Sequence, residues 1–292
     1  MSIANIEVTD SNQQTIRKEV SIEGIGLFTG KKIKLRLLPA PVNSGIVFQR
    51  VDLPQKPKFL ASLDFVKETH YCTFIKNEAG SVQTVEHLLS TLAAYGIDNL
   101  FIEIDGPELP IGDGSSSIFV NMIEEATLAL QDAKKEIIKV LKPIYYSDKD
   151  IHLIALPSDE YKISYTLHYS HSTFLKSQHF DFVVNSDLYK KEISSCRTFS
   201  IYEEIKHLIE NKFLRGGGLN NAVIIKDNKV INPDGTRFPD EMVRHKVLDL
   251  IGDLSLLAKP LLAHVIAIRS GHFSNILFAK KIKDSITLEI HS

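Results

Sequence analysis

Two short segments of the chain carry side chains of the types that bind metal ions, Thr84-Val85-Glu86-His87 and His245-Lys246-Val247-Leu248-Asp249. On a helix, side chains four positions apart lie on one face with their Cβ atoms roughly 5–6 Å apart, so His245 and Asp249 can bind one ion together. His87 supplies a third ligand, and Glu86 beside it supplies a carboxylate that can act as a base. Three protein ligands leave a fourth position for water, which is typical of a catalytic zinc site.

The same spacing also has simpler interpretations. His and Asp four positions apart on a helix often form an ordinary surface ion pair, and the dipeptide Glu-His is common by chance. Two further features favour the metal site. Ser270-Gly271-His272 places another imidazole beside a glycine that lets a ligand approach the backbone. Asp253, two turns along the helix from His245, can hold the imidazole of His272.

The order of several motifs along the chain adds a family resemblance. The chain resembles the family of UDP-3-O-acyl-N-acetylglucosamine deacetylases, zinc amidases of the committed step of lipid A synthesis in Gram-negative bacteria. Each matching segment is weak evidence alone, but they follow the family's order over nearly all 292 residues. The segments are Thr84-Val85-Glu86-His87-Leu88, Gly96-Ile97-Asp98-Asn99, Asp113-Gly114-Ser115, Ser195-Cys196-Arg197-Thr198-Phe199, Val243-Arg244-His245-Lys246, Asp249-Leu250-Ile251-Gly252-Asp253 and Ser270-Gly271-His272.

The resemblance implies hydrolysis of the acetamide of UDP-3-O-(3-hydroxyacyl)-N-acetylglucosamine to acetate and a free amine. In that reaction Glu86 accepts a proton from the attacking water, a contribution of about 10²–10⁴ in rate. His272, cationic beside Asp253, stabilises the oxyanion or protonates the departing amine. By the family pattern Thr198 donates its hydroxyl to the same oxyanion, although a threonine at a strand end also commonly serves packing alone.

The contacts to the rest of the substrate are also expected from the resemblance. Lys246, next to a proposed ligand and therefore about 100° around the helix, is expected to bind a phosphate at the mouth of the site. A solvated helix lysine is the alternative. We expect an apolar sleeve for the acyl chain from Phe199, Ile205 and Leu219, any of which can instead belong to the core. Arg269 stands where the family commonly has a basic residue near the nucleotide.

Two other functional classes remain open on the sequence. The same residues could serve another metal-dependent amidase or peptidase, and in a non-enzymatic binding module His245 and Asp249 would form only a salt bridge. The metal itself is expected to be zinc, with iron(II) as the alternative, because histidine and carboxylate ligands suit both ions.

Composition and charge limit the partners and the compartment. The chain is 43% hydrophobic and 24% charged, as in ordinary globular proteins, and its net charge of −2 gives no electrostatic reason to expect nucleic acid. It has no 18-residue apolar run and no basic-then-apolar segment at the N-terminus, so we expect a cytoplasmic protein without integral membrane association. We expect a monomer. Cys72 and Cys196 form no CxxC and are expected to be reduced thiols with packing roles.

The hydrophobic pattern predicts a mixed α and β structure. Apolar residues alternate at 16–22, 32–38 and 100–104, and further strand-like runs occupy 137–140, 151–155, 161–167, 223–225, 263–268 and 275–279. A helical period marks 85–95, 115–131, 201–212 and 239–258. A charged stretch without apolar period at 132–135 predicts a boundary between domains 1–132 and 133–292.

The resemblance adds what the pattern does not show. It implies an α+β fold of two similar domains, each a β-sheet layered against α-helices, with the active site between them. A small insert is expected in each domain, at about 59–83 and 206–230. The first domain would then supply Glu86 and His87, and the second His245, Asp249 and His272.

Two glycine-rich segments look like binding loops but follow no phosphate-binding motif. The glycines of 24–31 match neither GxGxxG nor GxxxxGK[ST], and Lys32 stands where the hydroxyl should be. A hairpin turn is therefore expected there. Arg215-Gly216-Gly217-Gly218 fits either a turn that follows the predicted 201–212 helix or a loop that gates access of the substrate.

Overall fold

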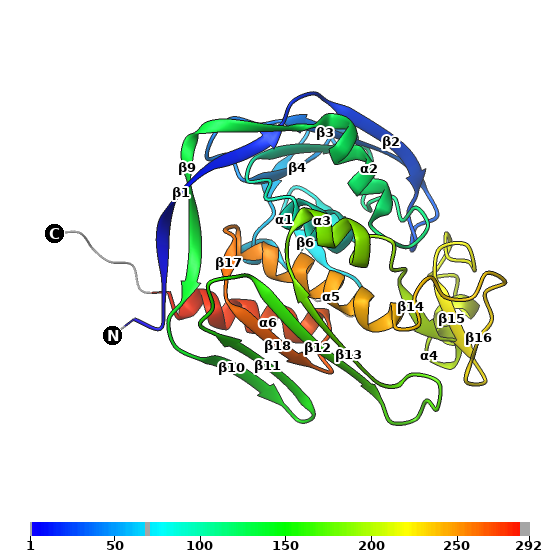
Figure 1. Cartoon of the computed structure of the whole chain (residues 1–292). Helices are drawn as coiled ribbons and strands as arrows, with labels where there is room; N and C mark the ends of the chain where they lie inside the picture. The colour runs from blue at the N-terminus through cyan, green and yellow to red at the C-terminus, as the bar shows by residue number, and fades with distance from the viewer. Residues whose placement is uncertain (1, 68–70, 287–292) are drawn as a thin grey trace.

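The computed structural model describes residues 2–67 and 71–286 and is a mixed α and β structure. Two five-stranded sheets form the outer layers, and helices lie between them (Figure 1). The first sheet has the strand order β2-β3-β8-β4-β5, and the second has the order β10-β11-β18-β12-β13. If the strands of each sheet are numbered from one to five in chain order, both sheets have the order 1-2-5-3-4. The two halves therefore share one topology, which confirms the expected fold class.

Within each sheet one strand pair is parallel and the others are antiparallel. The parallel pairs are β4 with β8 and β12 with β18. The strands of the first sheet are β2 (Val20–Ile25), β3 (Lys32–Pro39), β4 (Ile46–Arg50), β5 (Lys58–Leu60) and β8 (Leu100–Ile104). Those of the second are β10 (Ile144–Asp148), β11 (Ile151–Leu156), β12 (Lys162–Tyr169), β13 (Lys176–Val183) and β18 (His264–Ile268).

Alternation of apolar and polar residues explains why these segments are strands. In β3 the side chains of Ile33, Leu35 and Leu37 are buried, and the lysines at 32 and 34 are exposed. One face of the sheet therefore packs on the helices while the other faces solvent. The run predicted at 16–22 is interrupted, because Ile16 ends one strand and Val20 begins the next.

A long ribbon connects the two halves. It pairs β1 (Ala4–Ile16) with β9 (Leu128–Val140), and β17 (Leu261–Leu262) adds to β9 in parallel. The helix predicted at 115–131 is wrong in its last part, because α2 (Ser117–Ala126) ends before Thr127, whose φ is 55°, and the chain then pairs with β1. The stretch 132–135 lies inside β9, so a continuous strand crosses the expected domain boundary. The division into domains 1–132 and 133–292 stays a prediction.

Two helices at the centre of the molecule pack directly against each other. They are α1 (Glu86–Ala94) and α5 (Glu241–Leu254), which continues into η3 (Ser255–Leu257), and both follow the predicted periods (Figure 1). Gly252 permits this approach: a Cβ there would lie 2.3 Å from the carbonyl oxygen of Glu86. The close contact brings the first turn of α1 against the second half of α5.

The strand predicted at 275–279 is wrong. This segment lies within α6 (His272–Asp284), which buries Ile276, Ala279 and Ile282. Residues three apart lie on one face of a helix. A short apolar run such as 275–279 occurs in strands and in buried helix segments alike, so the pattern did not distinguish the two. The Ser274 hydroxyl accepts a hydrogen bond from the backbone amide of Gly271 and so caps the start of the helix.

Smaller elements lie in the regions where inserts were expected. The first region holds β6 (Phe74–Lys76), β7 (Ser81–Gln83) and η1 (Leu63–Phe65). The second holds most of α4 (Tyr202–Glu210) and the strands β15 (Val223–Lys226) and β16 (Lys229–Val230), which pair with β14 (Phe199–Ile201). Two further short helices, α3 (Ser186–Leu188) and η2 (Tyr189–Ile193), complete the described chain.

The two glycine-rich segments meet in space. Residues 26–31 form the turn between β2 and β3, which confirms the predicted hairpin. The loop after α4 packs on that turn, because the amide of Gly216 donates to the carbonyl of Leu27 at 3.0 Å. A gating role of this loop stays a prediction. Both cysteines are free, and no helix in the described ranges is long and apolar enough to cross a bilayer.

Candidate metal and catalytic site

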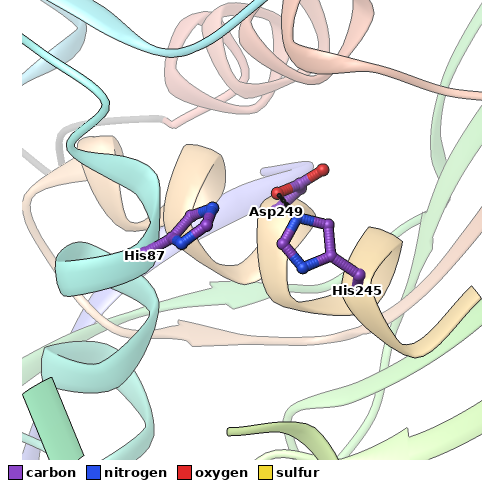
Figure 2. A group of neighbouring side chains, drawn as sticks. All are labelled: His87, His245 and Asp249. Atoms are coloured by element: carbon purple, nitrogen blue, oxygen red, sulfur yellow. Dashed lines mark ion pairs between the residues drawn. The ribbon is translucent and has the colours of Figure 1, made fainter. Parts of the chain in front are cut away.

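Three elements bring the predicted ligands and catalytic residues together. Glu86 and His87 occupy the first turn of α1, which follows β7 through Thr84 at a φ of 59°. His245 and Asp249 project from α5 toward His87 (Figure 2). The ligand atoms of these three side chains all lie within 4.8 Å of one another, and all three residues are buried. The structure thus contains a three-residue cluster suited to one metal ion.

The hydrogen bond of His245 shows which of its nitrogens can face a cation. Its Nδ1 lies 3.0 Å from the carbonyl oxygen of Cys196, and because a carbonyl only accepts, Nδ1 carries the proton. In the neutral ring Nε2 then has a free electron pair, and it lies 3.3 Å from Oδ1 of Asp249. That buried oxygen has no hydrogen-bond partner among the described residues. Two electron pairs facing each other in a buried site fit a bound cation, and a backbone carbonyl on the far ring nitrogen is typical of metal-binding histidines.

The charge states of the other two ligands fit the same interpretation. Burial lowers the pKa of His87 to about 3, so the ring is neutral at pH 7. Burial alone would raise the pKa of Asp249, but the charges of Lys246 and His272 hold it well below its usual value. A neutral imidazole and an ionised carboxylate are the forms that bind divalent metals.

Glu86 lies beside the cluster as a separate carboxyl group. Its side chain is buried, and its Oε2 accepts a hydrogen bond from the backbone amide of Thr73 at 3.0 Å. Burial raises the pKa of Glu86 to about 7, against the opposing charge of His272. A carboxyl group with a pKa near neutrality is suited to accept a proton as a general base.

His272 and Asp253 form the second charged group of the site. The Nδ1 of His272 lies 2.9 Å from Oδ2 of Asp253, and the amide of Asn275 donates to the same oxygen at 2.8 Å. Burial alone would lower the pKa of His272, but the carboxylates of Asp253 and Asp249 outweigh it and raise the pKa to about 9. The imidazole is therefore cationic at pH 7, and its Nε2 lies 4.0 Å from Asp249 at the cluster.

Two adjoining cavities open at this site. A cavity of about 180 Å³ is lined by Glu86, His87, His245, Asp249 and His272. A cavity of about 390 Å³ lies beside it and is mostly apolar; Phe199, Ile205 and Leu219 are among its lining residues. Thr198 and Phe199 line both, and so does Tyr71 of the first expected insert. The proposed catalytic groups therefore lie at one end of an apolar chamber.

Lys246 and Arg269 differ in their relation to the site. Lys246 lines the smaller cavity, and its Nζ lies 2.9 Å from Oδ2 of Asp249. Burial would lower the pKa of Lys246, but the charge of Asp249 raises it above the usual value, so the side chain stays cationic. Arg269 is absent from the described residues that line the two cavities, and its guanidinium lies 3.7 Å from Asp150.

Several residues that hold the site were not found from the sequence. They are Thr73, which contacts Glu86 and Asp253, Asn275, which contacts Asp253, and the carbonyl of Cys196, which orients His245. The carbonyl has no side-chain signal at all. Thr73 and Asn275 are polar residues within runs of mixed composition, and only their complete burial distinguishes them.

Comparisons with known proteins identify one family over most of the chain. The model of a family described as UDP-3-O-acyl N-acetylglycosamine deacetylase matches residues 13–284. A UDP-3-O-acyl-N-acetylglucosamine deacetylase of Chlamydia pneumoniae is 45% identical over 280 residues, covering 96% of this chain and 99% of the relative. Enzymes of the same name from Chlamydia muridarum (strain MoPn / Nigg) and Chlamydia felis (strain Fe/C-56) are 45% and 43% identical, over 95% and 94% of this chain and 96% and 98% of theirs. This chain belongs to the UDP-3-O-acyl N-acetylglycosamine deacetylase family.

Proposed function

We propose that the protein is a metal-dependent amidohydrolase. Its substrate would be UDP-3-O-(3-hydroxyacyl)-N-acetylglucosamine, which it converts to the free amine and acetate at the committed step of lipid A synthesis. The observation that carries this proposal is the juxtaposition of His87, His245 and Asp249 with a separate buried carboxyl group at Glu86. Membership of the deacetylase family supports the choice of substrate.

His87, His245 and Asp249 would hold the metal. We propose zinc as the ion, and iron(II) suits the same histidine and carboxylate ligands. When bound, such an ion supplies Lewis-acid chemistry: it polarises a carbonyl group and makes a nearby water more acidic. Lys246 balances the charge of Asp249 from the opposite oxygen and so keeps that carboxylate ionised.

Glu86 would act as the general base. Its ionised form accepts a proton from water attacking the acetamide carbon, and its raised pKa makes it a stronger base than an exposed carboxylate. The backbone amide of Thr73 holds one oxygen of the group, which leaves the other oxygen free to take the proton.

His272 would act as the cationic partner. Its Nδ1 is engaged by Asp253, so the Nε2 proton is the one available to the oxyanion or to the departing amine. An amine leaves readily only when its nitrogen is protonated. Thr198 lines the same cavity, and we propose that its hydroxyl donates to the oxyanion.

The larger cavity would hold the acyl chain. Its volume of about 390 Å³ and its largely apolar lining, which includes Phe199, Ile205 and Leu219, fit a hydrocarbon chain. Lys246 would contact a phosphate with the donors that its bond to Asp249 leaves free, because an ammonium group has three. We also propose that Arg269, which is not among the described residues that line the two cavities, contacts the nucleotide.

Acetate release tests this proposal directly. Purified protein incubated with UDP-3-O-(3-hydroxymyristoyl)-N-acetylglucosamine should release one acetate per free amine formed. The Glu86→Ala variant should be nearly inactive under the same conditions. Acetylated peptides and UDP-N-acetylglucosamine lacking the acyl chain serve as comparison substrates. Faster turnover of either would instead favour another amidase or peptidase.

A further inference from the structure

Thr73 touches both proposed catalytic groups from a third part of the chain. It directly precedes β6, and its side chain is fully buried. Its backbone amide donates to Oε2 of Glu86 at 3.0 Å, and its hydroxyl donates to Oδ1 of Asp253. One residue therefore lies between the carboxyl group on α1 and the Asp253–His272 pair on α5 and α6.

The hydrogen bonds of Asp253 show why the hydroxyl matters. Oδ2 is held by His272 at 2.9 Å and by Asn275 at 2.8 Å. Oδ1 has the Thr73 hydroxyl and only a longer contact of 3.2 Å to His272. Without that hydroxyl, one oxygen of a fully buried carboxylate would lose its close donor, and the group could turn about its Cβ–Cγ bond.

The position of His272 depends on this carboxylate. The Thr73 Oγ1 also lies 3.3 Å from Nδ1 of His272, so threonine, aspartate and imidazole form one buried cluster. A hydrogen bond to a charged group is stronger than one between neutral groups, and a buried acceptor that loses its donor is destabilised by a comparable free energy. A small rotation of Asp253 would move Nε2 of His272 relative to the cavity in which it acts.

We propose that Thr73 is a positioning residue that sets the separation of the two catalytic groups, Glu86 and His272. Its amide fixes the carboxyl group of Glu86, and its hydroxyl fixes Asp253 and through it the imidazole. The role rests on the proposed deacetylase function. It also gives the segment that leads into β6 a task in catalysis.

Substitutions at Thr73 separate its hydroxyl from its shape. Thr73→Val keeps the volume and the backbone amide but removes the donor, so kcat should fall about 10- to 100-fold with KM unchanged. Thr73→Ser keeps the hydroxyl and should stay near the wild-type rate. Metal content should be the same in all three proteins, because Thr73 does not contact the metal cluster.

Thr15→Val is a matched control far from the site. Thr15 is also buried, and its Oγ1 accepts a hydrogen bond from the amide of Ala40 at 3.1 Å. Its replacement should cost stability as Thr73→Val does, while kcat stays at the wild-type value. A second readout is a double-mutant cycle with Asp253→Asn. If Thr73 acts through Asp253, Thr73→Val should lower kcat much less in the Asp253→Asn background.

Several results would overturn the role. A folded Thr73→Val variant with the wild-type kcat would do so. An equal loss of kcat in Thr73→Ser and Thr73→Val would also do so, as would a Thr73→Val variant in which only KM changes. If Thr73→Val does not fold, Thr73→Ala against Thr73→Ser makes the same comparison.

If the wild-type protein releases no acetate, the deacetylase function fails, and crystal structures then test Thr73 separately. Asp253 should be rotated away from His272 in Thr73→Val, and an unmoved carboxylate would refute the proposal.

Discussion

Burial raises the pKa of Glu86, and neighbouring carboxylates raise the pKa of His272. The pKa of Glu86 rises from 4.5 to about 7 and that of His272 from 6.5 to about 9. Glu86 must be ionised to accept a proton, and His272 must be protonated to donate one. Both conditions hold together between these two values, so each residue determines one limb of the pH profile.

We expect a bell-shaped dependence of kcat/KM on pH. Activity rises as Glu86 ionises and falls as His272 loses its proton. A bound divalent cation would lower the pKa of both groups and so move both limbs to lower pH. The test is therefore the difference between variants. Asp253→Asn removes the carboxylate that stabilises the imidazolium, so the basic limb should move to lower pH. His272→Gln should reduce the rate and flatten that limb. An unchanged rate and limb in His272→Gln would show that another group is the acid.

Replacement of Glu86 tests whether it is a base or a metal ligand. Glu86→Ala should lower kcat by about 10²–10⁴, because the proton acceptor acts only as the transition state forms. Metal content should not change, since Glu86 lies outside the cluster of three ligands. Metal analysis beside steady-state kinetics makes the comparison. Loss of the metal along with the activity would place Glu86 among the ligands.

At the scale of elements, the site depends on how closely α1 approaches α5. The two helices carry all three proposed ligands and meet where Gly252 faces the backbone of Glu86. The i, i+4 spacing of His245 and Asp249 is a property of one helix. The position of His87 relative to them is a property of the helix pair.

Gly252→Ala should therefore disturb both stability and the site. A Cβ would lie 2.3 Å from one backbone atom of Glu86 and 2.9 Å from two others, and backbone cannot move aside as a flexible side chain can. We expect a loss of about 1–3 kcal/mol in the free energy of unfolding, together with weaker metal binding. Denaturant unfolding and metal titration measure the two effects. A more stable variant with wild-type metal affinity would show that the helices have room to separate.

At the scale of the whole molecule, the metal would connect the two halves of the chain. His87 comes from the half with the first sheet, and His245 and Asp249 come from the half with the second. A ligand that binds only the folded protein stabilises it, so an ion at this position would hold the sheet-and-helix units together.

Removal of the metal should lower thermal stability. With free metal at about a hundred times its Kd, binding contributes about 2.7 kcal/mol, so a chelator should lower the Tm by about 4–5 °C. Calorimetry with and without chelator measures this shift. His87→Ala/Asp249→Ala should bind no stoichiometric metal, and its Tm should not respond to chelator. Tight stoichiometric binding in that variant would refute the assignment of ligands.

The sequence by itself determined the residue types of the site and most of the elements that carry them. The spacing of His245 and Asp249 is local, because four positions along a helix always bring two side chains to one face. Alternating runs such as 32–38 and 100–104 determined strands in the same local way. The order of the family motifs then indicated which of several histidines and carboxylates belong together.

Only the tertiary structure decided the features that depend on partners distant in the chain. Residues 128–131 continue a helical pattern but lie in β9, which pairs with β1, and residues 275–279 have the pattern of a strand but lie in α6, because pairing and packing outweigh local propensity. The approach of His87 to His245 and the contacts of Thr73 with Glu86 and Asp253 join separate elements. No local period encodes such contacts. They arise only when packing and buried hydrogen bonds bring those elements together.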